Sequence, residues 1–211
     1  MTTYHVLEVA NELSIDSVCL ASSINVLGSN FQAEPTEVTY LPMDESHPLT
    51  PRDPYALGKH CLEVTADGFA RLDEPPRTIS SIRFPWVLSE SELRRMLAEV
   101  DRSMDGIRNP PAFMADVNEY TTRDVMFSYL HVADAADIVR RAIEADFDGH
   151  EAFWAVASDT TAAVDSERLV EACYEDVERR RPIGGRNALI ETEKAHQMLG
   201  WEPQHSWTDF T

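Results

Sequence analysis

Two residues with complementary chemistry, Tyr55 and Lys59, stand four positions apart in the sequence. If the segment is helical, residues at this spacing lie on one face, about one turn apart. A nearby ammonium stabilises a phenolate, so the pair suits a tyrosine that exchanges a proton with a substrate hydroxyl. Only Lys59 and Lys194 are lysines among the 18 basic residues, so the ammonium at this position is unusual for the chain. The alternative is a surface helix that carries the two residues by chance.

The flanking sequence predicts the elements that would position this pair. Residues 54–70 are predicted to form a helix, because Pro54 favours the first helical turn. Residues 17–21 form a short apolar run that is typical of a buried strand, and this run ends at Ser22 and Ser23. A helix that follows a strand in this way would bring the tyrosine and lysine close to the serines.

Alternating periodicities along the rest of the chain predict an α/β fold with a parallel sheet. Further helices are predicted over residues 4–13, 91–104, 134–146, 165–179 and 191–199, and further strands over 78–84, 127–132 and 152–157. The segments 29–53 and 105–124 are predicted to be irregular because they are polar and rich in proline, asparagine and aspartate. A loop as long as the first of these is often functional.

The charge of the chain excludes some classes of partner. The formal net charge is −19, and the acidic residues are spread along a sequence that contains four tryptophans and eight phenylalanines. Such a dispersed acidic surface, with lysine nearly absent, indicates adaptation to molar salt, where screening reduces self-repulsion. It argues against nucleic acid and anionic membranes, which both require a basic surface.

The cysteines and the apolar runs predict a cytoplasmic protein. Cys19, Cys61 and Cys173 are odd in number and widely spaced, which predicts reduced thiols and no disulfide framework. Neither these cysteines nor the seven histidines show the spacing of a metal site, so we predict none. We see no signal peptide, and no apolar run approaches the length of a membrane-spanning helix.

Five stretches, taken in their order, resemble the NAD-dependent epimerase/dehydratase family, the extended short-chain dehydrogenases. They are Ser22-Ser23 with Gly28, the run from Glu45 through His47-Pro48 and Pro51 to Tyr55, Lys59 and Glu63, then Ser81 to Val87, Tyr129 to Asp134, and Leu199 to Pro203. Each motif alone is weak, but five motifs in the family's order are specific. The resemblance spans nearly the whole chain.

This resemblance implies roles for three catalytic residues and for NAD or NADP as cofactor. Tyr55 would be the acid/base that takes a proton from a substrate hydroxyl, or returns it in the reverse direction. Lys59 would hold the nicotinamide ribose and assist Tyr55. Ser23 would hydrogen-bond the reacting oxygen, where a pair of donors stabilises the charge that develops.

The resemblance implies supporting roles for other residues. Ser22 and Pro85 would contribute to the cofactor site, and Asn25 would contact substrate. The alternative for the serines is that they only end a strand and cap a turn. His131 and Asp134 follow the family pattern, but we interpret them as structural residues at the start of a helix.

One departure from the family concerns dinucleotide binding. The family's Gly-x-x-Gly-x-x-Gly turn is absent, because Gly28 is the first glycine of the chain. The sequence therefore predicts a partial Rossmann-like doubly wound sheet that lacks its first strands. Residues 1–90 would be the C-terminal part of the dinucleotide-binding domain, and residues 91–211 mainly a substrate-binding lobe with segments returning to the sheet. Either the chain is a truncated form of a longer protein, or it is a short protein that has lost dinucleotide binding.

A second departure concerns the substrate. Phe127 stands where nucleotide-sugar epimerases of the family carry an arginine that meets the diphosphate. We therefore predict an NAD(P)-dependent oxidoreductase or epimerase that acts on a sugar, sugar acid or similar hydroxy compound. The alternative is a catalytically silent, truncated family member that serves as an interaction module. The partners would be a small-molecule substrate and, in a homodimer, a second copy of the chain, since family members often dimerise through the helix that carries Tyr55.

Overall fold

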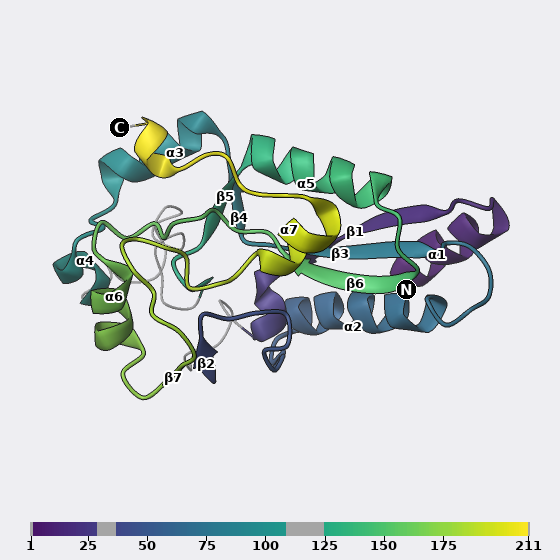
Figure 1. The fold of residues 1–211 in the computed structure, drawn as a ribbon, viewed down its shortest axis with the longest axis horizontal. Helices are drawn as coiled ribbons and strands as arrows, with labels where there is room; N and C mark the ends of the chain where they lie inside the picture. Colours follow the sequence, from purple (N-terminus) through teal and green to yellow (C-terminus); the bar gives the residue numbers. More distant parts are fainter. Residues whose placement is uncertain (1, 29–36, 109–124, 211) are drawn as a thin grey trace.

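The structure is a computed structural model. Its fold is built on a small parallel sheet, which is seen nearly edge-on in Figure 1. The structure describes residues 2–28, 37–108 and 125–210. Three strands form the sheet in the order β1–β3–β6: Ser17–Ser23 (β1), Thr78–Phe84 (β3) and Gly149–Trp154 (β6). Both pairings are parallel, which confirms the predicted α/β class with a parallel sheet.

Helices cover both faces of this sheet. Helices α1 (Thr2–Glu12) and α2 (Pro54–Phe69) pack on one face, and α5 (Val132–Glu144) packs on the other, so α5 and α2 bracket the sheet in Figure 1. Each face has its own apolar core. Leu7, Leu20, Ala66 and Ile79 fill the first core, whereas Ile82, Leu130, Ile138 and Phe153 are among the residues of the second. The helices predicted over 4–13, 54–70 and 134–146 are therefore confirmed with small shifts at their ends.

Local sequence explains why α2 begins where it does. The side chain of Asp53 accepts hydrogen bonds from the backbone N–H groups of Tyr55 and Ala56, at 2.8 and 2.9 Å. Pro54 follows as the first helical residue, where its missing N–H costs nothing. Tyr55 is therefore held in the first turn of a capped helix, and its orientation depends on that cap.

The remaining elements form a lobe beyond the C-terminal ends of β1 and β3, with some segments that return to the sheet (Figure 1). Two short parallel pairs occur there: Tyr40–Leu41 (β2) with Glu178–Arg179 (β7), and Trp86–Leu88 (β4) with Tyr129–His131 (β5). Its helices are Glu90–Glu99 (α3), Met104–Arg108 (α4), Ser166–Cys173 (α6) and Glu193–Leu199 (α7), with 3-10 turns at Ile24–Leu27 (η1) and Trp207–Phe210 (η4). The proposed division at residue 90 stays a prediction. Two elements after residue 90 belong with the sheet, because β6 is one of its strands and α5 packs on one of its faces.

The helix predicted over 91–104 is too long, and a second helix, α4, makes residues 105–108 helical where the sequence predicts an irregular segment. Helix α3 ends at Glu99, and Val100 has an extended backbone. The side chain of Asp101 accepts the backbone N–H of Ser103 at 2.9 Å, which starts a new turn before α4. Short polar side chains compete with the helical backbone at this point. Most of the segment predicted to be irregular, residues 109–124, lies outside the described residues.

The helix predicted over 165–179 is also too long. Helix α6 ends at Cys173, and Tyr174 leaves the helical conformation to bury its ring. Residues 178–179 instead pair with β2, and the N–H of Arg180 continues that ladder to the carbonyl of Leu41 at 2.9 Å. This pairing depends on residues far away in the sequence, so periodicity could not reveal it. Similarly, β2 interrupts the long loop predicted over 29–53.

The strand predicted over 152–157 lies three residues earlier, because its backbone changes partners after Trp154. Ala155 still contacts β3, whereas the N–H of Ala157 donates to the carbonyl of Tyr129 in β5 at 2.8 Å.

Within the described part of the chain, no helix is both long and apolar enough to cross a membrane.

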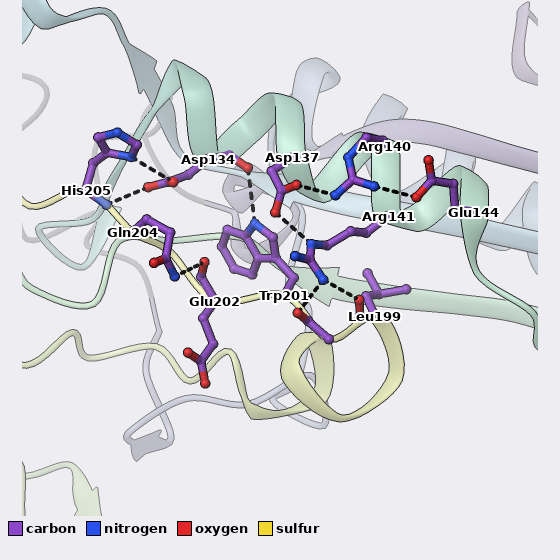
Figure 2. Close-up of polar contacts among 11 residues, drawn as sticks. Asp134, Asp137, Arg140, Arg141, Glu144, Leu199, Trp201, Glu202, Gln204 and His205 are labelled. Carbon is purple, nitrogen blue, oxygen red and sulfur yellow. Dashed lines mark hydrogen bonds and ion pairs between the residues drawn. The ribbon is translucent and has the colours of Figure 1, made fainter.

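The C-terminal segment is fixed to α5 by polar contacts (Figure 2). Arg141 donates to the carbonyl of Gly200 at 2.6 Å, and the indole of Trp201 donates to the carbonyl of Asp134 at 3.2 Å. The Asp134 carboxylate in turn accepts the backbone N–H of His205 at 3.0 Å. His131 caps the same helix, since its ring accepts the N–H of Ala133. His131 and Asp134 thus have the structural positions that the sequence predicts.

Candidate active site

Four polar side chains follow one another at four-residue spacing along α2. They are Tyr55, Lys59, Glu63 and Asp67. Lys59, Glu63 and Asp67 each contact the sheet or a side chain that it carries. Residues at i and i+4 share a helix face, so the row lies where α2 meets the strands. The first two residues of this row are the predicted tyrosine and lysine.

The ammonium of Lys59 lies between its helix and the first strand. Its Nζ is 5.6 Å from the centroid of the Tyr55 ring and donates to the backbone carbonyl of Ala21 at 2.5 Å. Ala21 immediately precedes Ser22 and Ser23 at the C-terminal end of β1. The predicted pair is therefore on one face of one helix and reaches the strand that bears the predicted serines. Tyr55 is 47% exposed, so ligands can approach its ring.

Ser23 ends β1 and begins the turn that follows. Its Oγ accepts the backbone N–H of Asn25 at 3.2 Å, which caps the 3-10 turn η1. Gly28 closes this turn with a φ of 82°, a conformation that favours glycine. Ser23 and Asn25 are both buried. Ser23 therefore does cap a turn, which is the structural alternative that the sequence offers for this residue.

Ser22 points to the opposite face of the strand and meets a buried ion pair. Its Oγ donates to Oε1 of Glu63 at 2.6 Å, and Arg83 of β3 donates to both carboxylate oxygens of Glu63, at 3.0 and 2.8 Å. Both charged side chains are about 5% exposed. The Arg83 guanidinium also lies over the Trp154 ring of β6, with its Cζ 4.6 Å from the centroid. One carboxylate on α2 is therefore connected to all three strands.

Pro85 and Glu45 lie near the same end of the sheet. Pro85 follows Phe84, which is paired with Ser23 in the register of β1 and β3, and it is buried. Glu45 accepts the backbone N–H of Trp154 at 2.9 Å. Burial raises the pKa of the Glu45 carboxyl above its usual range, because a carboxylate is poorly solvated there.

The sequence motifs predict roles for most of these residues, but they predict none for Glu63 and Arg83. Tyr55, Lys59, Ser23, Asn25 and Pro85 all lie around the C-terminal ends of β1 and β3. The four-residue spacing that continues from Lys59 to Glu63 was the available signal for Glu63. Ser22 is close to the others in sequence, but its hydroxyl donates to Glu63. Its predicted part in cofactor binding stays a prediction.

A second polar cluster lies in the lobe and surrounds Trp207. The guanidinium carbons of Arg102 and Arg186 lie 4.0 and 4.7 Å from its ring centroid. Burial, and to a smaller extent the charge of Arg186, lower the pKa of Arg102. Beside this cluster, Tyr129 donates to Asp159 at 2.6 Å. Two guanidinium groups around one ring form a candidate for contact with an anion. In the described segments no group of three or more metal-ligating side chains occurs.

The comparison with protein families decides the wider assignment. The model of the NAD-dependent epimerase/dehydratase family matches residues 1–156. The chain belongs to this family. A curated family relative is the UDP-glucose 4-epimerase of Rhizobium meliloti, which is 26% identical over 230 aligned positions. That alignment covers 96% of this chain and 67% of the relative. A putative UDP-glucose 4-epimerase of Methanocaldococcus jannaschii is 40% identical over 70 residues, or 33% of this chain and 21% of that protein.

Solved structures show the same fold. A short-chain dehydrogenase/reductase superfamily protein from Agrobacterium tumefaciens with bound NAD superposes with a TM-score of 0.64 and 16% identity, covering 99% of this chain and 68% of that one. The structure of MoeE5 in complex with UDP-glucose and NAD gives 0.59 and 16%, covering 98% and 69%. This epimerase/dehydratase chain therefore spans about two thirds of the length of these relatives.

Proposed function

We propose that this family member is an NAD(P)-dependent oxidoreductase or epimerase that acts on a hydroxyl group of a sugar through Ser23, Tyr55 and Lys59. One observation supports the proposal most strongly. Lys59 lies beside the Tyr55 ring and is bonded to β1 at Ala21, two residues before Ser23. The side chains of a tyrosine, a lysine and a serine are thus carried near one end of a parallel sheet, and this end is where ligands of α/β proteins bind.

The proposed chemistry follows from the types of these side chains. A bound nicotinamide would supply the hydride acceptor or donor, while the protein orients the reacting groups. The phenolate oxygen of Tyr55 would take the proton of the sugar hydroxyl as the carbon that bears it is oxidised, and the resulting Tyr55 hydroxyl would return that proton on reduction. Ser23 would donate to the same oxygen, because its Oγ acts as an acceptor toward the N–H of Asn25 and a hydroxyl can also donate. Lys59 would stabilise negative charge on the Tyr55 oxygen.

The residues of the chain fit one end of the cofactor. Hydroxyl groups of a ribose need donors such as the Lys59 ammonium, which lies at the C-terminal end of β1. The pyrophosphate end would need backbone N–H groups at a glycine-rich turn. The eight glycines of this chain form no such Gly-x-x-Gly-x-x-Gly turn. Lys59 would therefore hold the nicotinamide ribose, and the chain supplies no such turn for the pyrophosphate.

The substrate class has two candidates. Phe127, in place of an arginine, favours a sugar, sugar acid or similar hydroxy compound without a diphosphate. The names of several relatives instead specify UDP-sugars. Arg102 and Arg186 around Trp207 favour this second candidate, because paired guanidinium groups bind phosphate oxygens well. A competition experiment would distinguish the candidates, because it measures whether UDP-glucose or glucuronate binds the site more tightly.

The functional alternative is a catalytically silent family member that acts as an interaction module. Titration with NADH in molar potassium chloride, followed by nicotinamide fluorescence, separates it from the enzyme. We expect saturable binding, weakened about tenfold or more in Lys59→Met, since hydrogen bonds to charged groups contribute about 1.5–3 kcal/mol. Lys194→Met is the matched control, because Lys194 also donates to a sheet carbonyl, that of Ala152 at 2.9 Å. No binding by a chain that circular dichroism shows to be folded would favour the silent alternative.

We also propose that two copies of the chain associate through α1 and α2. Their outer faces carry large apolar side chains that are about half exposed: Tyr4, Val6, Val9, Leu57 and Val64. Exposed apolar side chains on neighbouring helices are a feature of interaction sites. Leu57 and Val64 are exposed on α2, whereas Lys59 and Glu63 of the same helix contact β1, so a dimer would leave the polar row in place.

A further inference from the structure

Glu63 connects α2, the helix that carries Tyr55 and Lys59, to the sheet. It follows Lys59 by one helical turn and accepts the hydroxyl of Ser22, the residue before Ser23. We infer that Glu63 is a positioning residue, which sets the register of α2 against β1 and thereby places Lys59 and Tyr55 beside Ser23. This inference rests on the proposed function, because it assigns a role within the same site.

The contacts of neighbouring turns show how the register is set. Lys59 bonds to the carbonyl of Ala21, and Glu63 bonds to the side chain of Ser22. Consecutive turns of the helix thus bind consecutive residues of the strand. A shift or rotation of α2 that lengthened the Glu63 contact would also move the ammonium away from Ala21. The two contacts are therefore geometrically coupled.

Arg83 makes the position of Glu63 difficult to change. Its guanidinium engages both carboxylate oxygens, in a bidentate arrangement that fixes orientation as well as distance. Its third nitrogen, Nη1, is buried and has no hydrogen-bond partner within the described structure. The Trp154 ring covers the group. Loss of the carboxylate would leave a buried cation without its partner, so α2 cannot easily adopt another register.

A purely structural ion pair is the competing explanation, and α2 contains a matched control for it. Asp67 stands one turn after Glu63 and bonds to Nδ1 of His150 at 2.7 Å, while Nε2 of His150 is 2.8 Å from the Oγ of Ser81. This contact also links α2 to the sheet. It lies two turns from Lys59, so its loss should affect folding without moving the lysine.

Lysine side-chain NMR can test the inference without any turnover. The chain has only two lysines, so a sample labelled with ¹³C,¹⁵N-lysine gives side-chain signals from Lys59 and Lys194 alone. We expect Glu63→Gln to shift and broaden the Lys59 signal, because a glutamine amide presents N–H groups to Arg83 where the carboxylate accepted. Lys194 should keep its signal, and Asp67→Asn should move neither.

A second variant distinguishes a change in the position of Lys59 from a general effect of misfolding. Ser22→Ala removes the link to β1 and leaves the ion pair with Arg83, and we expect a smaller shift of the same Lys59 signal. If the protein turns over a sugar substrate, kcat should fall roughly 10- to 100-fold in Glu63→Gln, the range expected for a displaced catalytic group. Unchanged Lys59 signals in folded Glu63→Gln and Ser22→Ala would overturn the inference. Absence of turnover in the wild type would count against the proposed function only.

Discussion

The ammonium of Lys59 donates a hydrogen bond to the backbone carbonyl of Ala21 at 2.5 Å. A lysine on the surface of a helix usually moves freely in water, and fixing it costs side-chain entropy. Here the strand carbonyl restrains the ammonium 5.6 Å from the Tyr55 ring. The contact with Ala21 therefore helps to hold the cation that the proposed chemistry requires near the Tyr55 ring.

We expect Tyr55→Phe to abolish turnover while the fold is preserved. The substitution removes only the hydroxyl that would carry the proton, and acid–base catalysis by one side chain is typically worth about 10²- to 10⁴-fold. The ring stays and the cap at Asp53 uses only backbone N–H groups, so α2 should form as before. Steady-state assays of NAD reduction, with circular dichroism on the same samples, measure both effects.

Tyr4 provides the control for this experiment. It lies on α1 and is 45% exposed, close to the 47% of Tyr55, so Tyr4→Phe removes a comparable hydroxyl away from the site. We expect Tyr4→Phe to retain wild-type turnover. If Tyr55→Phe were equally active, the acid/base role of Tyr55 would be wrong.

Val64→Asp should dissociate the proposed dimer. Val64 is 54% exposed on α2, and a carboxylate there would be buried against its counterpart in a symmetric interface. Ile143→Asp is the control, since Ile143 is 50% exposed but lies on α5, on the other face of the sheet. Sedimentation velocity in molar salt should show a dimer for the wild type and Ile143→Asp, and a monomer for Val64→Asp. A monomeric wild type would contradict the proposal.

Glu45 should make stability depend on pH with a definite sign. Burial raises its pKa in the folded state above the ordinary value of 4.5, so the folded protein holds this proton more tightly than the unfolded chain. The stability that it contributes is complete below the unfolded pKa and is lost as the pH rises through the folded pKa. A glutamine side chain at this position would keep an acceptor for the Trp154 N–H and would not ionise.

Glu45→Gln should therefore become more stable, relative to the wild type, as the pH rises from about 4 to 7. The quantity to measure is the difference in melting temperature between variant and wild type at each pH, because the other acidic residues cancel in this difference. Glu37→Gln is the control, since the Glu37 side chain is exposed beside Arg52. A difference for Glu45→Gln that does not change with pH would show that Glu45 does not titrate in this range.

The sequence predicts elements whose causes are local and misses those that depend on distant contacts. Helix α2 follows from Pro54 and from the cap at Asp53, and strand β3 from its continuous buried run. The two-residue strands β2 and β7 exist only because distant segments meet. Glu63 and Arg83 run against the rule that charged residues are exposed, and their pairing joins a helix to a strand twenty residues away, so local sequence does not predict that they are buried together.

The same distinction applies to the candidate site. Tyr55 and Lys59 could be paired from their spacing, and the approach of their helix to the strand that bears Ser23 could be predicted from the strand-to-helix order and the family motifs. The contact of Lys59 with Ala21 could not be predicted, because it depends on the register between α2 and β1. The Arg102 and Arg186 cluster also joins residues far apart in the sequence, and it is organised by Trp207 near the C-terminal end.

Asp134 should contribute more to stability than Asp137, although both carboxylates stand on α5 and both form polar contacts in Figure 2. Asp134 has a side chain that is 4% exposed, and it accepts both the backbone N–H and the ring Nδ1 of His205. Asp134→Ala would leave a part-buried N–H without its acceptor and loosen the C-terminal segment, at a cost of about 1–3 kcal/mol.

Asp137 differs from Asp134 in being accessible to water. Its carboxylate is 34% exposed, and its partners Arg140 and Arg141 are accessible as well. Asp137→Ala should cost less than about 1 kcal/mol, as is usual for surface ion pairs, and molar salt should reduce that cost further. Urea unfolding of both variants in the same salt gives the comparison. Equal losses of unfolding free energy would mean that the contact between Asp134 and His205 does not anchor the C-terminal segment.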